Sequence, residues 1–76
     1  MRETMYVQFP ERLNMLRREK GITADKMAKA LFVEIRTYRK YESGHIMPDY
    51  RKLIILADIL EVSLDYLLCR CENRDE

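Results

Sequence analysis

The chain has few of the residues that interrupt regular structure. Its 76 residues include two glycines and two prolines, whereas Leu, Ala, Met, Glu, Lys and Arg are abundant. Because the abundant types favour helices and the scarce types break them, the composition predicts helices throughout. A linker, a repeat and a low-complexity segment are all missing, so we expect one domain near the lower size limit for a self-sufficient core. An apolar share of 47% excludes a disordered chain.

Groups that carry catalysis or bind metals are equally scarce. The two cysteines, Cys69 and Cys71, cannot complete a zinc site alone, and the single histidine, His45, is distant in sequence. A disulfide of this spacing is strained and disfavoured in a reducing compartment, so we expect one buried and one exposed thiol. Without a nucleophile or paired carboxylates, His45 supports no catalytic arrangement. The sequence predicts no enzyme, no metal site, no cofactor and no small-molecule ligand.

The sequence also lacks a membrane-spanning or signal segment, a run of exposed aromatic residues and a strong net charge, and each absence excludes or disfavours a class of protein. No apolar run could span a membrane and no signal-peptide pattern opens the chain, which predicts a cytoplasmic protein without membrane contact. A run of exposed aromatic residues, which single-strand binding would require, is absent. A strong net charge is absent too, but residues 1–57 carry 12 basic and 7 acidic side chains, whereas residues 58–76 carry 2 and 6. The first part could present a basic face to phosphates, or simply a solvated mixed-charge surface.

The most informative segment that is present, residues 23–43, has the pattern of two short helices joined by a tight turn. Thr23 is suited to cap the first helix, and the second is expected to start near Val33 or Glu34. Residues at helical spacing give the two helices their inward faces: Met27, Ala28, Leu31, Tyr38 and Tyr41. Two crossed helices, the second with a basic exposed face, are the components of a helix-turn-helix DNA-binding motif.

Three more helices are expected around this pair. The first starts at Pro10, which suits an initial helical position, and ends at Gly21 in a left-handed conformation. After Ser43-Gly44, Asp49 and Ser63 are suited to cap two further helices. Their expected core residues are Leu13, Leu16, Leu53, Leu56, Ala57, Leu60, Leu64, Leu67 and Leu68. We therefore expect an N-terminal arm at 1–9, where a weak alternation also permits a short strand, a helical domain at 10–71 and a tail at 72–76.

Together these segments resemble the Cro/CI-like, XRE-type helix-turn-helix regulators that include the phage repressors. RLNMLRREKGIT resembles the first helix and turn of the family, and KMAKALFVEIRTYRKYESG its helix-turn-helix and following turn. MPDYRKLIILADILEVSLDYLL is similar to its fourth and fifth helices. The resemblance covers residues 12–68 and implies a compact, all-α, five-helix domain of the lambda-repressor type.

The resemblance also implies a role for each matching position. The second helix of the pair would be the recognition helix in the major groove, and Thr23 and Ala24 would approach the phosphate backbone. The loop of residues 43–47 would offer backbone N–H groups to phosphates. Arg17 and Glu42 match a family pair that forms a partly buried ion pair. The implied DNA-binding residues are Thr23, Ile35, Arg36, Thr37, Arg39, Lys40, Ser43 and His45.

Four features depart from the family pattern. Phe32 replaces the usual glycine of the turn, where a left-handed conformation is strained for other residues, so the turn could be altered or the first helix extended. Ala24 replaces a glutamine that contacts DNA, and Glu34 replaces a serine or threonine and would repel phosphates. The loop at residues 45–47 is less basic than usual. All four departures favour weaker or differently registered DNA contact.

The predicted function is sequence-specific binding of double-stranded DNA by a transcriptional regulator, most simply a repressor. Arg36 and Lys40 project from one side of a helix, and arginine can bind guanine O6 and N7 together, although a solvated helix face is the commoner fate of such residues. The alternative is a protein-interaction module that keeps the fold with weak or no specific DNA binding. A separate sensor domain has no room in this chain. Ile55 and Ile59 form a second apolar surface, which either the N-terminal arm or the C-terminal helix covers or a second copy contacts. A homodimer is expected through this surface, and its candidate residues are Ile55, Ile59, Leu64 and Leu68.

Overall fold

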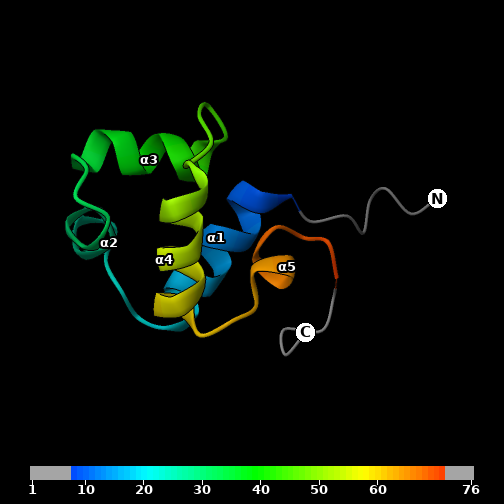
Figure 1. Ribbon diagram of the computed structural model, residues 1–76. Coiled ribbons are helices and arrows are strands. Elements are labelled where there is room, and N and C mark those ends of the chain that lie inside the picture. Colours follow the sequence, from blue (N-terminus) through cyan, green and yellow to red (C-terminus); the bar gives the residue numbers. More distant parts are fainter. Residues whose placement is uncertain (1–7, 72–76) are drawn as a thin grey trace.

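The computed structural model describes residues 8–71 and is shown in Figure 1. Within that range the chain is all-helical and contains no strand, which confirms the predicted fold class. Its five helices are α1 (Phe9–Glu19), α2 (Ala24–Ala30), α3 (Ile35–Ser43), α4 (Tyr50–Leu60) and α5 (Leu64–Leu67). The predictions for residues 1–7 and for the tail at 72–76 lie outside the described residues.

Helix α1 is central to the packing. It contacts α3 on one side and α5 on another, while α2 packs on α3 and α4 packs on α5. Figure 1 shows α3 lying across one end of the molecule, next to α2 and above α4. The best-buried core side chains, each at most 1% exposed, come from several of these helices: Leu13, Leu16, Met27, Tyr38, Leu56 and Leu67. Among residues 8–71, no helix is both long and apolar enough to cross a membrane.

The helix ends follow from local sequence. The three predicted N-caps, Thr23, Asp49 and Ser63, each accept a hydrogen bond from the backbone N–H three residues later, at 3.0–3.1 Å. The two glycines adopt left-handed conformations, with φ of 71° at Gly21 and 84° at Gly44, and so end α1 and α3. These five positions account for the starts of α2, α4 and α5 and for the ends of α1 and α3.

Two predicted helix starts differ from the structure by one or two residues. Helix α1 begins at Phe9 rather than Pro10, and Phe9, assigned to the arm, is only 7% exposed. One face of the helix carries Phe9, Leu13 and Leu16. Phe9 adopts a helical conformation because this buries its aromatic ring beside the two leucines. Helix α3 begins at Ile35, with Glu34 as its N-cap residue in an extended conformation.

Two predictions for the C-terminal part are wrong. Leu64 was expected in the core but is 36% exposed, because α5 is a single turn whose inward positions are filled by Tyr66 and Leu67. Cys69 and Cys71 were expected to be one buried and one exposed thiol, but both are half-buried. Neither difference changes the fold, because α5 is a single turn and both cysteines lie after its last residue, Leu67.

The turn between α2 and α3 keeps its left-handed residue even though that residue is phenylalanine. Phe32 has φ of 59°, and its side chain is 91% exposed. Helix α2 ends at Ala30 and does not run on through the turn. Burial of Leu31 on one side, at 2% exposed, and Val33 on the other fixes the chain path. Tertiary packing thus imposes the strained conformation on Phe32, which itself buries almost nothing.

We expect Phe32→Gly to raise the free energy of unfolding by about 0.5–1 kcal/mol. Glycine removes the left-handed strain, and this gain exceeds the entropy that glycine adds to the unfolded chain. Urea denaturation measures the change. A control variant, Ala30→Gly in the last turn of α2, adds the same flexibility without relieving strain and should lower stability by about 0.5–1 kcal/mol. Equal losses in both variants would show that Phe32 carries no strain.

Candidate nucleic-acid interface

Helix α3 has two chemically different sides. Tyr38 and Tyr41 face inward, 0% and 4% exposed, with their rings in an edge-to-face contact at 6.1 Å between centroids. Arg36, Arg39 and Lys40 fall on the opposite side of the helix by their spacing, and all three are exposed. The inner aromatic side therefore holds the helix to the core while the basic side is left to solvent or to a ligand.

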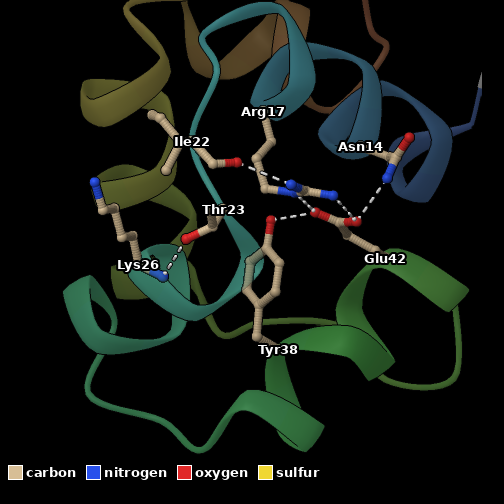
Figure 2. Close-up of polar contacts among 7 residues, drawn as sticks. All are labelled: Asn14, Arg17, Ile22, Thr23, Lys26, Tyr38 and Glu42. Carbon is tan, nitrogen blue, oxygen red and sulfur yellow. Dashed lines mark hydrogen bonds and ion pairs between the residues drawn. The ribbon is translucent and has the colours of Figure 1, made fainter.

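The inward side of α3 also carries a largely buried carboxylate. The Glu42 side chain is 12% exposed, and Arg17 on α1 donates to it through Nε, at 2.6 Å from Oε2, and through Nη2, at 3.2 Å from Oε1. Asn14 Nδ2 donates to Oε1 at 2.7 Å, and the Tyr38 hydroxyl donates to Oε2. Figure 2 shows the three donors converging on the two carboxylate oxygens. The ion pair that the resemblance implied is present, within a larger network.

Arg17 also joins this network to the start of α2. Its Nη1 atom donates to the backbone carbonyl oxygen of Ile22 at 2.8 Å, and Ile22 immediately precedes the N-cap residue Thr23. Figure 2 shows the guanidinium lying between that carbonyl and Glu42. One side chain thus fixes α1, α3 and the entrance to α2 relative to one another, which sets the geometry of both helices of the motif.

The network determines the charge states of its members. Burial by itself raises the pKa of Glu42, but the hydrogen bonds from Arg17, Tyr38 and Asn14 and the charge of Arg17 outweigh it and hold the pKa below its ordinary value of 4.5. Burial, together with the bond to Glu42, raises the pKa of Tyr38 well above its ordinary value, so its hydroxyl stays a donor. The bond to Glu42 likewise raises the pKa of Arg17.

The sequence of this motif matches known proteins. Residues 11–70 match a family model described as a helix-turn-helix domain. The chain belongs to this helix-turn-helix family. Because the match covers most of the chain and coincides with the five helices, it confirms the family that the sequence resembled.

The relatives of this helix-turn-helix domain are transcriptional regulators. The uncharacterized regulator YqaE of Bacillus subtilis is 45% identical over 60 residues, which are 79% of this chain and 52% of that protein. The cryptic phage CTXphi transcriptional repressor RstR of Vibrio cholerae is 36% identical over 64 residues, 84% of this chain and 57% of RstR. A crystal structure of a transcriptional regulator from Listeria innocua has a TM-score of 0.77 and 40% identity, and covers 83% of this chain and 59% of that one. This chain therefore spans little more than half the length of these relatives.

The other predicted DNA-binding residues of this helix-turn-helix domain differ in how exposed they are. Thr23, Ser43 and His45 are exposed, Ile35 is 36% exposed and Thr37 is half-buried on the flank of α3. Ser43 Oγ lies 2.7 Å from His45 Nδ1, so these two side chains hold each other at the end of the helix. They remain side-chain candidates for contact with a phosphate.

The backbone of the loop after α3 is less available than predicted. The N–H groups of Gly44 and His45 donate to the carbonyl oxygen of Lys40, His45 at 3.0 Å, and Ile46 N lies 3.4 Å from the same oxygen. The left-handed Gly44 turns the chain back over the end of α3, which brings these groups onto one acceptor. The prediction that this loop offers its N–H groups to phosphates is therefore wrong for these three residues.

The predicted dimer residues are only partly exposed. Ile55 and Ile59 on α4, and Leu68 after α5, are half-buried and pack against the core, whereas Leu64 is 36% exposed. Ile54, which the sequence analysis did not select, is 46% exposed. Separately, no group of three or more His, Cys, Asp or Glu side chains in residues 8–71 is arranged to hold a metal.

Sequence reasoning missed several polar residues that organise this domain. Arg12 on α1 is 2% exposed, its guanidinium carbon lies 4.0 Å from the ring centroid of Tyr66, and its Nη1 atom donates to the Tyr66 carbonyl oxygen at 2.9 Å. Asn14 and the Tyr38 hydroxyl, both bound to Glu42, were missed too. A signal existed for two of them: Arg12 lies on the apolar stripe of α1, and Tyr38 is one helical turn before Glu42.

Glu42→Gln removes the charge at the centre of the network and keeps its shape. We expect it to lower the free energy of unfolding at pH 7 by about 2–3 kcal/mol, because charged hydrogen bonds are lost. The pKa of Glu42 in the folded protein lies below 4.5, so stabilisation by the ionised form is complete above that pH and is lost as the pH falls through the folded pKa. The difference between wild type and E42Q should therefore shrink below pH 4.5.

Urea denaturation at pH 7 and at several lower pH values measures this difference. Lys29→Ala is the control, because Lys29 and Asp25 form an exposed ion pair at 3.2 Å, with side chains 78% and 57% exposed. Its loss should change stability by less than about 0.5 kcal/mol. A difference for E42Q that stays constant down to the acid transition would contradict an ionised Glu42 as the source of the stabilisation.

Proposed function

We propose that this domain binds double-stranded DNA sequence-specifically and regulates transcription, with α3 in the major groove. The observation that carries the proposal is the outward face of α3, on which Arg36, Arg39 and Lys40 are exposed on a helix whose other side is fixed by Tyr38 and Glu42. A rigid helix fits the major groove, and exposed arginine and lysine side chains can donate hydrogen bonds to the acceptors on the base edges there.

The relatives support this proposal and suggest that the regulation is repression. RstR is named a transcriptional repressor and covers the same helix-turn-helix residues. Repression requires only that the bound domain occupy an operator, so a small domain that binds DNA tightly is sufficient for it. We therefore propose repression as the mode of action. A reporter gene placed downstream of a selected binding sequence tests this: lower expression is the expected result, and higher expression would contradict it.

We expect Arg36→Ala to weaken binding to the preferred sequence by about 1–3 kcal/mol and to relax the preference at one base pair. Selection from a random duplex library gives the preferred sequence, and titrations at one salt concentration give its affinity and that of a random duplex. Arg70→Ala removes the same charge beside α5, where Arg70 pairs with Asp65, and should leave the preference unchanged. Equal losses on both duplexes for R36A would show that Arg36 contacts phosphate alone.

A second candidate function is a protein-interaction module that has kept the fold. It is favoured by the 91% exposed ring of Phe32 in the turn and by the acidic Glu34 at the start of α3, because both would face or border the DNA surface. A salt-dependent gel shift with random duplex DNA separates the two candidates. Binding that weakens steeply with salt supports DNA binding, and no binding even at low salt supports the interaction module.

We also propose that two copies bind DNA together as a homodimer through α4 and α5. One helix-turn-helix reads a short site, so specificity normally requires two half-sites about one helical turn apart. Helices α4 and α5 pack on each other, and the partly exposed residues that could face a second copy lie on them or directly after α5: Ile55, Ile59, Leu64 and Leu68.

Leu64→Glu should convert the dimer to a monomer without unfolding it. Leu64 is already 36% exposed, so a carboxylate is tolerated in the monomer but is costly within an apolar interface. Analytical ultracentrifugation measures the mass, with circular dichroism as the folding control. Ile54→Glu is the matched variant, because Ile54 is 46% exposed on a different side of α4 from Ile55 and Ile59. A wild type that stays monomeric at high concentration would contradict a preformed dimer.

A further inference from the structure

Glu34 and Arg36 form an ion pair at the start of α3. The Nε atom of Arg36 lies 3.3 Å from Oε1 of Glu34, and the side chains are 81% and 76% exposed. Residues two apart do not face each other within a helix. The contact is possible here because Glu34 is the N-cap residue, whose extended backbone (φ −74°, ψ 154°) directs its side chain along the first turn.

Glu34 is the N-cap residue of α3, but its carboxylate does not cap the helix. An N-cap side chain normally accepts a hydrogen bond from a backbone N–H of the first turn, as Thr23, Asp49 and Ser63 do elsewhere in this chain. Glu34 makes no such bond. Its acceptor is directed at Arg36 instead, so changing Glu34 removes a contact with Arg36 and no helix cap.

The pairing leaves the other end of the guanidinium available. Among the contacts of residues 8–71, Arg36 donates a hydrogen bond through Nε alone. The N–H groups of its two Nη atoms therefore remain available to a ligand. Guanine offers O6 and N7 as two adjacent acceptors in the major groove, and a guanidinium binds them best when its plane is fixed. A carboxylate held against Nε restricts the rotation of that plane.

We propose that Glu34 is a positioning residue that sets the base preference of Arg36 for guanine. This inference rests on the proposed DNA binding by α3. Glu34 acts through Arg36: it holds the guanidinium so that both Nη groups meet one guanine, and it disfavours the rotated orientations in which Arg36 would bind a phosphate. The negative charge that weakens contact with DNA overall thus sharpens the choice between base pairs.

The competing explanation is that Glu34 only repels phosphates. Repulsion of this kind lowers the affinity for every duplex by the same factor and leaves the ratio between two sequences unchanged. Positioning changes that ratio. Glu34→Gln and Glu34→Ala separate the two effects, because both remove the charge, whereas the glutamine keeps an acceptor oxygen for Arg36 Nε and alanine does not.

The experiment measures the affinity of wild type, E34Q and E34A for two duplexes. They differ only at the base pair whose preference is relaxed in R36A. Both variants should bind all DNA more tightly than wild type, since a negative charge is gone. E34A should lower the preference ratio by about threefold to fivefold, as expected for losing an ion pair of exposed type, and E34Q should keep most of it. In an R36A background, E34A should have no effect on the ratio.

Three other results would contradict either this inference or the proposed function. If E34Q and E34A tighten binding equally and leave the ratio unchanged, Glu34 acts through charge alone and the inference is wrong. If E34A lowers the ratio even in R36A, Glu34 contacts a base itself and the inference is again wrong. A wild type that shows no preference among duplexes would refute the proposed function, a failure that is distinct from both. Circular dichroism of each variant confirms that α3 is intact.

Discussion

The position of α3 depends on one largely buried carboxylate. Both oxygens of Glu42 accept hydrogen bonds, from Arg17 and Asn14 on α1 and from Tyr38 on α3 itself. A charge that is excluded from water is tolerated only while such partners remain in place. Helix α3 therefore cannot shift or rotate against α1 without breaking several charged hydrogen bonds together, and the bond from Arg17 to the Ile22 carbonyl extends the same constraint to the start of α2.

This constraint explains how α3 can combine strong anchoring with a solvent-exposed basic face. A helix of nine residues is too short to be stable alone, so its stability comes from tertiary contacts on its inner side. Tyr38 contributes twice, through a ring that is fully buried and through a hydroxyl that binds Glu42. The outer side contributes little to this anchoring, so Arg36, Arg39 and Lys40 remain exposed there.

Sequence reasoning predicted what depends on neighbours in the chain and missed what depends on tertiary contact. Helix caps such as Thr23 follow from local chemistry, and the core residues follow from periodicity, so both agree with the structure. The exposure of Leu64 and the convergence of Asn14 on Glu42 depend on distant elements, and no local pattern specifies them. The pairing of Arg17 with Glu42 came from family resemblance, because two charges 25 residues apart carry no local signal.

The electrostatics around α3 bear on how the proposed DNA contact would divide between phosphates and bases. The N–H groups of Gly44 and His45 are bonded to the Lys40 carbonyl oxygen, so little main-chain capacity is left in that loop to bind a phosphate. Lys29 is paired with Asp25, and Lys52 with Asp49, which offsets part of the positive charge around the motif. In the proposed complex, each phosphate contact that is lost in this way lowers the affinity for every duplex alike. If the domain binds DNA as proposed, its preference for a particular site rests on base contacts by α3 and on a second half-site, because phosphate contacts do not distinguish between sequences.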